Sequence, residues 1–360
     1  MNPFANRHDI ALVVPTIREA SFARFIEEWH RAGLFEHVDL IIIEDNPKAT
    51  FGVNQALREI TDVVHFSWED IDRELGSASW IIPRRSDTVR SFGYWYAWKR
   101  EYDYVLTLDD DVYPPTQSDG IVYENARAFL DEHLKYLDGY TRWFNTLSTA
   151  KPRGLPFYNL GRKKNVVLNH GLWTNVLDYD APTQLSNPTR ERFANDNRLV
   201  PQGQYFPMCG MNLMFKRSAI VLTYHLLMGQ LWDRMANGGT GGLTKLPFDR
   251  WGDIGCGIIL KRICDLTDLS VASGMPYARH DRASNVFANL RKEAAVLEVN
   301  EKLWEYVDSF FPSDDAVIDG LPAVYSEMGG HIMRWDAFPE YGEYFSLLGR
   351  AMKEWARLFQ

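Results

Sequence analysis

The chain has 360 residues, of which 46% are hydrophobic and 24% charged, so it is long enough to bury a sizeable globular core. Its formal net charge of −9 disfavours a nucleic-acid partner, because binding to a phosphate backbone is driven by a basic surface that releases counterions. No apolar run is about 18 residues long, the length that predicts a membrane-spanning helix, and the N-terminus lacks the pattern of a signal peptide.

The first third of the chain alternates short apolar runs with helix-like stretches, which predicts an α/β sandwich. Residues Leu40 to Ile43 are apolar at every position, as in a strand of a parallel sheet that helices cover on both faces. Ligands of such sheets bind outside the carboxyl ends of the strands, where Pro15–Thr16, Glu44–Asp45 and Asp109–Asp111 fall. The apolar runs are 9–16, 37–46, 63–68, 79–85 and 103–111, and the helix-like stretches are 21–33 and 89–100.

Three consecutive carboxylates, Asp109, Asp110 and Asp111, follow an apolar strand and would repel one another without a nearby cation. If the extended geometry continues that far, strand alternation points Asp109 and Asp111 to one side and Asp110 to the other. A pair of carboxylates on one side suits Mg²⁺ or Mn²⁺, which also accept oxygens from phosphates and water. The alternative is a solvated acidic turn that the prolines at 114 and 115 bring to an end.

Other polar residues extend this candidate site. Asp45 could accept hydrogen bonds from a nucleobase or ribose, or it could cap the turn that follows it. His280 could complete a metal site as a neutral imidazole, or it could be structural. A charged segment could grip a diphosphate through its guanidinium groups or form surface ion pairs; it contains Arg84, Arg85, Asp87 and Arg90.

The region from residue 140 to 290 consists of short apolar segments and loops. Its glycine-rich stretch 236–247 is interpreted as a lid over a site or as a surface loop. Three cysteines, Cys209, Cys256 and Cys264, have no metal-binding spacing, which favours reduced and mostly buried thiols in the cytoplasm.

The C-terminal tail is predicted to be helical. Its apolar residues recur at helical spacing, and they would pack on the main domain or form a contact in an oligomer. These residues are Val296, Val299, Leu303 and Val307, followed by Phe345, Leu348, Met352, Trp355 and Phe359.

Several long motifs appear in order between residues 9 and 293. They are "VVPTIR" (13–18), "TLDDD" (107–111), "RGLPF" (153–157), "HGLWTNVLDYDAPTQL" (170–185), "FPMCGMNL" (206–213) and "SGMPYARHDRASNVFANLRKE" (273–293). In these motifs the chain resembles the reversibly glycosylated polypeptide family, whose best-known members are plant UDP-arabinopyranose mutases. The C-terminal helices match that family only loosely.

The resemblance implies an α/β fold of the GT-A type, a nucleotide-diphospho-sugar transferase sandwich with a mainly parallel central sheet. We expect residues 1–290 to form this UDP-sugar-binding catalytic domain and residues 291–360 to form a helical extension packed on it. Members of the family bind UDP-sugars with Mn²⁺ or Mg²⁺, become glycosylated on an arginine and associate with one another. Several of them interconvert UDP-L-arabinopyranose and UDP-L-arabinofuranose.

The resemblance also implies roles for individual residues. Asp109, Asp111 and His280 would hold the metal, and Arg153, which precedes "GLPF", matches the glycosylated arginine. A second family arginine corresponds to Arg162 after insertion of one residue, and a family aspartate corresponds to Asp253 or, alternatively, to Asp249. The residues expected to bind the nucleotide are Thr16, Asp45, Arg85, Asp87, Arg90, Asp109, Asp110 and His280.

Exchange of a six-membered for a five-membered sugar ring is difficult while UDP stays attached, so a transient bond from C1 to the protein is expected. A metal ion would stabilise the departing UDP. If Arg153 is the nucleophile, it needs a base, because a guanidinium has no free lone pair; Asp253, Asp110 and Asp111 are the candidates. Alternatively, Arg153 clamps the diphosphate.

The expected function is therefore that of a metal-dependent UDP-arabinopyranose mutase, or of a relative that acts on another UDP-sugar. The first alternative is a glycosyltransferase that passes the sugar to an acceptor or to itself. The second is a catalytically silent UDP-sugar-binding subunit.

Overall fold

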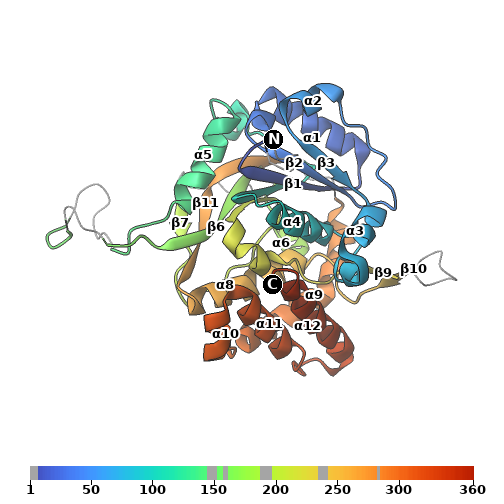
Figure 1. Ribbon diagram of the computed structural model, residues 1–360, viewed down its shortest axis with the longest axis vertical. Coiled ribbons are helices and arrows are strands. Elements are labelled where there is room, and N and C mark those ends of the chain that lie inside the picture. The colour runs from blue at the N-terminus through green and yellow to red at the C-terminus, as the bar shows by residue number, and fades with distance from the viewer. Residues whose placement is uncertain (1–6, 144–151, 157–160, 187–196, 234–241, 282–283) are drawn as a thin grey trace.

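A nine-stranded sheet forms the middle layer of the computed structural model (Figure 1), which describes residues 7–143, 152–156, 161–186, 197–233, 242–281 and 284–360. The strand order is β3-β2-β1-β4-β8-β6-β11-β5, with β7 also paired to β11. The strands are β1 (Ile10–Thr16), β2 (Asp39–Glu44), β3 (Val63–Phe66), β4 (Tyr104–Leu108), β5 (Val112–Tyr113), β6 (Asn165–Asn175), β7 (Asn197–Leu199), β8 (Asn212–Lys216) and β11 (Leu269–His280).

The pairing pattern makes this sheet mainly parallel. Strands β3, β2, β1 and β4 are parallel neighbours, and β6 and β11 form another parallel pair. Strand β8 lies between β4 and β6 and is antiparallel to both, so β1, β2, β3, β4, β6 and β11 all run in one direction. Strands β5 and β7 run antiparallel to β11. The mainly parallel sheet expected from the sequence is thus confirmed.

Helices cover both faces of this sheet because its strands are apolar on both sides. In β1, Leu12 and Val14 pack with α1 and α5, whereas Ala11 and Val13 pack with α4 on the opposite face. The helices of the first part are α1 (Glu19–Arg31), α2 (Gln55–Ile60), α3 (Trp68–Leu75), α4 (Arg90–Lys99), α5 (Ala126–Leu137), α6 (Ala181–Ser186) and α8 (Gly252–Leu266).

The C-terminal helices pack against the α4 face of the sheet, at the bottom of Figure 1. The predicted apolar residues of this region are buried except Phe359, which is half-buried, and they join the same hydrophobic cluster as α4 and α8. Trp355 stacks on Tyr224 with ring centroids 5.1 Å apart and donates to the Val221 carbonyl at 2.8 Å. The helices are α9 (Val286–Asp308), α10 (Asp314–Asp319), α11 (Leu321–Ile332) and α12 (Gly342–Arg357).

Three sequence expectations differ from the structure or lie partly outside it. The region 140–290, expected to consist of short apolar segments and loops, contains the long strands β6 and β11 and helix α8. The run 79–85 is not a strand: its start belongs to a 3-10 helix, Gly76–Ile81, and only Arg84 pairs as an isolated bridge, with Gln230. Of the glycine-rich stretch, residues 236–241 lie outside the described residues. The remainder begins with β10 (Gly242–Lys245), which pairs with β9 (Gln230–Asp233) as a separate two-stranded sheet. Within the described ranges, no helix combines the length and apolar character needed to cross a membrane.

Candidate active site

A pocket of about 780 Å³ lies at the carboxyl ends of β1, β2 and β4, where the sequence placed its candidate residues. This volume is typical of a small-molecule site. Ten of the predicted site residues line it: Thr16, Asp45, Arg85, Asp87, Arg90, Asp109, Asp110, Asp111, Asp253 and His280. The alternative candidate Asp249 lines it too, although its carboxylate pairs with Lys292 at 2.9 Å.

The aspartate triplet is neutralised by two arginines that approach from different elements. Strand β4 ends at Leu108 and the triplet enters a turn, so the extended geometry on which the expected alternation depends stops before the triplet. Arg18, just after β1, contacts both Asp110 and Asp111, whereas Asp109 pairs with Arg90. Asp110 also accepts from Thr16 Oγ1 at 2.8 Å. Burial raises the pKa of Asp110 to about 6, although Arg18 and Thr16 favour its charged form.

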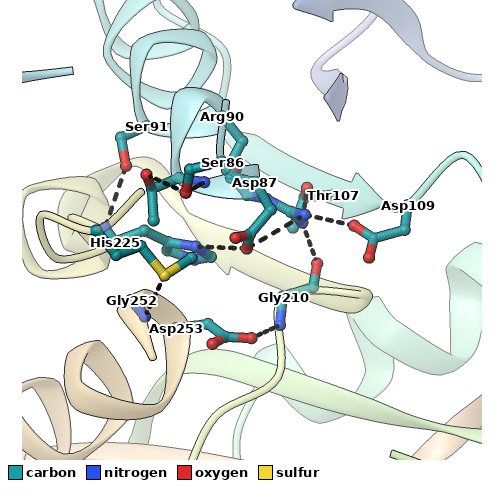
Figure 2. A network of polar contacts seen from close by, with 12 residues as sticks. Ser86, Asp87, Arg90, Ser91, Thr107, Asp109, Gly210, His225, Gly252 and Asp253 are labelled. Carbon is teal, nitrogen blue, oxygen red and sulfur yellow. Dashed lines mark hydrogen bonds and ion pairs between the residues drawn. The ribbon is translucent and has the colours of Figure 1, made fainter. Parts of the chain in front are cut away.

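The side chain of Arg90 is buried and bonds to protein groups that line the pocket (Figure 2), whereas the sequence predicted that it would bind a diphosphate. Its Nε donates to the Asp87 carbonyl at 2.9 Å, one Nη donates to Thr107 and the Gly210 carbonyl, and the other contacts Asp109. Burial alone would lower the pKa of Arg90, but the charges of Asp109 and Asp87 raise it above its ordinary value.

Arg84, expected in the same clamp, does not line the pocket. Its side chain is fully buried, bonds to the Ile82 carbonyl and pairs with Asp72 at 3.2 Å. The neighbouring Arg85 does line the pocket, with its guanidinium carbon 5.0 Å from the centroid of the Trp68 ring. Adjacent arginines therefore have different surroundings, which their sequence positions do not reveal.

Asp45 lies at the end of β2 and is held by bonds to both of its oxygens. Oδ1 accepts from Trp68 Nε1 at 2.7 Å, and Oδ2 accepts from the Ser86 backbone N–H at 2.9 Å. Burial raises the pKa of Asp45, and these bonds oppose the shift. A carboxylate can accept further bonds, so the residue could still contact a ligand hydroxyl.

His280 and Asp111 form the part of the site that best fits a divalent cation. His280 Nδ1 lies 2.8 Å from the Val176 carbonyl, which assigns the ring proton to Nδ1, and its Nε2 lies 4.0 Å from Asp111 Oδ1. The Asp111 carboxylate is the kind of oxygen donor that Mn²⁺ and Mg²⁺ prefer, and the oriented His280 ring could add a nitrogen ligand. Over the described part of the chain, no three His, Cys, Asp or Glu side chains already form such a site. Because these ions usually complete their shell with phosphate and water, two protein ligands are a fitting number.

A second acidic group, which the sequence analysis only partly identified, lines the pocket near Cys209 and Gly210. Asp253, in the first turn of α8, accepts from the Gly210 N–H at 3.1 Å. Burial and the charges of Asp87 and Asp178 raise the pKa of Asp253 to about 7. Asp178 is solvent-accessible through the pocket that it lines. The protein around its carboxyl group desolvates the charged form, which raises the pKa of Asp178 as well.

Several pocket residues were missed by sequence reasoning. Arg18 and Asp178 lie inside quoted motifs, and Arg18 follows a predicted strand end, so the strand-end rule could have found it. Of the pocket residues on α9, Lys292 and Glu293 end the quoted motif 273–293, whereas those after residue 293 lie in a stretch interpreted only for helical spacing. The pocket residues from α9 are Lys292, Glu293, Val296, Leu297 and Asn300.

The two predicted arginines of the covalent step lie outside the pocket. Arg153 is exposed in a turn, and Arg162 is exposed shortly before β6. Residues 152–156, drawn in green between two grey segments, lie well away from the sheet in Figure 1. The pocket and Arg153 are therefore separate in this conformation.

The fold and pocket define an α/β protein with an acidic ligand site at the carboxyl ends of a mainly parallel sheet. The family model described as "Reversibly glycosylated polypeptide" matches residues 5–360, and the chain therefore belongs to the reversibly glycosylated polypeptide family.

Curated relatives cover nearly the whole chain. It is 31% identical to "UDP-arabinopyranose mutase 1" of Arabidopsis thaliana, over 97% of this chain and 91% of that one. It is 31% identical to "Probable UDP-arabinopyranose mutase 1" of Zea mays over 97% and 90%, and 34% identical to "UDP-arabinopyranose mutase 1" of Oryza sativa subsp. japonica over 80% and 74%. The resemblance read from the motifs is thus confirmed and extends through the C-terminal helices.

Proposed function

We propose that the protein interconverts UDP-L-arabinopyranose and UDP-L-arabinofuranose in a GT-A type nucleotide-sugar fold. The observation that carries this proposal is the similarity, over 97% of the chain, to proteins named UDP-arabinopyranose mutases. The pocket at the carboxyl ends of the strands supports this proposal, because its carboxylates and arginines could position a nucleotide sugar. Residues 1–290 would supply most of this domain, with α9 of the C-terminal extension closing one wall of the pocket.

The proposed nucleotide contacts follow from the pocket geometry. Asp45 and Thr16 would contact the nucleoside, since both lie at adjacent strand ends. Arg85 and Arg18 are the pocket arginines best placed for the diphosphate, because Arg90 already makes several protein contacts. Asp87 would act through Arg90, whose Nη2 lies 3.7 Å from its carboxylate.

Asp111 and His280 would hold a Mn²⁺ or Mg²⁺ ion, with Asp109 nearby but engaged by Arg90. The ion would offset the negative charge of the diphosphate. Arg18 contacts Asp110 and Asp111 and so offsets part of the negative charge of the triplet. The chain therefore has its own means of neutralising the triplet.

We also propose a cellular location and an assembly state. All three cysteines are free and buried, as expected for thiols in the reducing cytoplasm. A homo-oligomer is also proposed, since family resemblance implies association between members.

Product analysis tests the mutase proposal directly. Purified protein incubated with UDP-L-arabinopyranose and Mn²⁺ is expected to form UDP-L-arabinofuranose, which chromatography separates from the substrate. A nucleotide sugar that stays unchanged would contradict the proposal for this substrate.

A transient glycosyl-arginine at Arg153 would require this exposed residue to reach the pocket. Intact mass after incubation with the UDP-sugar is expected to show one added glycosyl unit in wild-type protein and none in Arg153→Ala. Arg162→Ala tests the second candidate. Arg127→Ala, an exposed arginine paired with Asp131 on α5, is the control and should retain the adduct.

A glycosyltransferase is the second candidate function, and the exposure of Arg153 outside the pocket favours it. An exposed arginine is accessible as an acceptor for another molecule of the same protein. This function predicts release of free UDP together with permanent modification, whereas the mutase returns the sugar to UDP and ends unmodified.

A further inference from the structure

Asp178 and Asp253 are held by consecutive residues of the pocket wall. Gly210 donates its N–H to Asp253 Oδ2 at 3.1 Å, while Asp178 is hydrogen-bonded to the thiol of the preceding Cys209. Asp178 follows β6, and Asp253 belongs to α8, so the fold brings these carboxyl groups together from distant parts of the chain. The negative charge of Asp178 also acts on Asp253 and helps to raise its pKa.

Gly210 separates this acidic pair from the triplet. Its carbonyl accepts from Arg90, which pairs with Asp109, and its N–H faces Asp253 (Figure 2). A Cβ at this position would come within 2.9 Å of both Arg90 Nη1 and His225 Cε1. Close approach of the backbone therefore requires a residue without a side chain, and it fixes the spacing between the two parts of the pocket.

Two arginines of the described residues act on this pair. Arg90 favours the charged form of Asp253 but is already paired with Asp109. Arg250 interacts with both Asp178 and Asp253, but its Nε is already 2.8 Å from Glu293 Oε1. Glu293 is itself fixed, because its Oε2 accepts from the Ala181 N–H at 2.7 Å. The compensation is therefore incomplete, and burial raises the pKa of Asp178 and that of Asp253, the latter to about 7. A proton is available here near neutral pH.

We propose that Asp178 and Asp253 are the acid–base pair that exchanges the ring oxygen of the bound pentose, an inference that rests on the proposed mutase function. UDP first leaves C1 with the bonding electron pair while a protein group bonds to C1, and UDP attacks C1 again after the ring exchange. In between, Asp253 gives its proton to O5 as the C1–O5 bond breaks and the electron pair of that bond stays with O5. Asp178 accepts the proton of the O4 hydroxyl as an O4 lone pair forms the C1–O4 bond. One proton thus passes from Asp253 to Asp178, and the reverse conversion returns it.

The experiment measures conversion in both directions for wild-type protein, Asp178→Asn and Asp253→Asn, together with UDP binding by calorimetry. Each variant is expected to lose about 10²- to 10⁴-fold in kcat, the usual contribution of a general acid or base. UDP affinity should change by no more than about twofold, since the nucleotide is assigned to the other part of the pocket. Asp103→Asn is the matched control, because it removes a charge from an exposed aspartate that does not line the pocket.

The pH profile separates a chemical role from a merely structural one. Wild-type kcat should be bell-shaped, because the base must be ionised and the acid protonated. In the pyranose-to-furanose direction, Asp253→Asn should lose the decline at high pH and Asp178→Asn the decline at low pH, and in the reverse direction the two effects should exchange. The charged or titratable groups that act on the pair, and stay unchanged in these variants, are Asp87, Arg90, Asp109, Cys209, Arg250 and His280.

The outcomes are distinguishable. Wild-type protein that does not convert the nucleotide sugar would overturn the mutase proposal and this inference with it. If wild-type protein is active and both Asn variants retain its kcat, the acid–base assignment alone is wrong. Should a variant fail to fold, the wild-type profile still decides: a kcat independent of pH between about 5 and 9 would overturn the assignment.

Discussion

At the scale of single residues, the three aspartates are stable next to one another because each finds a cation. Arg18 contacts Asp110 and Asp111, and Arg90 contacts Asp109. Like charges at this distance would otherwise favour protonation of at least one carboxyl group. The raised pKa of Asp110, about 6, indicates that burial still outweighs the help from Arg18. Three carboxylates face two arginines, so part of the negative charge of the triplet stays uncompensated.

The metal assignment predicts that Asp111→Asn weakens UDP binding only when Mn²⁺ is present. We expect the Mn²⁺-dependent gain in affinity to fall by at least about tenfold, because one of two protein ligands loses its charge. Calorimetry with and without Mn²⁺ measures this gain. Asp103→Asn, an exposed aspartate before β4, removes the same charge outside the pocket and should leave the gain unchanged. An unaltered gain in Asp111→Asn would place the ion elsewhere.

At the scale of elements, α8 positions Asp253 by packing very closely on the segment 206–208. A Cβ on Gly257 would lie 2.5 Å from the Met208 backbone nitrogen and from the Phe206 carbonyl oxygen. The helix can therefore approach this segment only with glycine at position 257. Because Cys209 and Gly210 follow directly, this contact also sets the distance between α8 and the pocket wall.

Gly257→Ala is expected to push α8 away from this segment. Overpacking of this kind typically costs about 1–3 kcal/mol in the free energy of unfolding, and urea denaturation measures the loss. The shift should also lower kcat, since Asp253 moves with the helix. Gly342→Ala, in α12, is the control: nothing lies within 4 Å of its added Cβ, so the change should be neutral or stabilising by at most about 1 kcal/mol. Equal stability of both variants would refute the close-packing argument.

At the scale of the whole molecule, buried polar residues join segments that are far apart in the chain. His133 on α5 has Nε2 3.0 Å from Asn212 Oδ1 on β8, and its Nδ1 accepts from Asn169 Nδ2 on β6 at 2.9 Å. Asn169 and Asn197 both donate to the Met275 carbonyl of β11. This network uses the neutral tautomer of His133, since Nδ1 must keep its lone pair.

The network predicts acid sensitivity. Burial lowers the pKa of His133 to about 3, so between pH 6.5 and 3 the unfolded chain binds a proton that the folded chain excludes. Stability is therefore full above pH 6.5 and falls as the pH drops, by up to about 1.4 kcal/mol per pH unit for this group. In His133→Gln, urea unfolding between pH 7 and 4 should show a shallower dependence by one proton. His30→Gln, on the exposed surface of α1, should keep the wild-type slope; a wild-type slope in His133→Gln would contradict the prediction.

The C-terminal helices belong to the same folding unit as the sheet. Tyr344 donates to the Leu227 carbonyl and Trp355 to that of Val221, so α12 is tied to the segment after β8. Helix α9 adds residues to the pocket as well as to the core. The expected boundary near residue 290 falls inside this helix, which therefore connects the two parts rather than separating them.

The sequence by itself determined the local features of the protein. Apolar periodicity depends on neighbouring residues, so it predicted strands β1 to β4 of the first third, the C-terminal helices and the strand ends that carry Thr16, Asp45 and the triplet. It did not predict β6, β8 and β11, which lie in the region interpreted as short apolar segments and loops. The motif order also identified the family. The run 79–85 was the exception, because a short apolar stretch has the same composition in a buried 3-10 turn as in a strand.

Only the tertiary structure decided which charges meet. Arg18 and Asp110 are 92 positions apart, and Arg90 and Gly210 are 120 apart, so no local pattern could pair them. Burial of Arg84, exposure of Arg85 and the meeting of Asp178 with Asp253 depend likewise on how distant segments pack. Residue type and strand position set which chemistry is available, whereas long-range packing sets the partners and the desolvation that tune each carboxyl group.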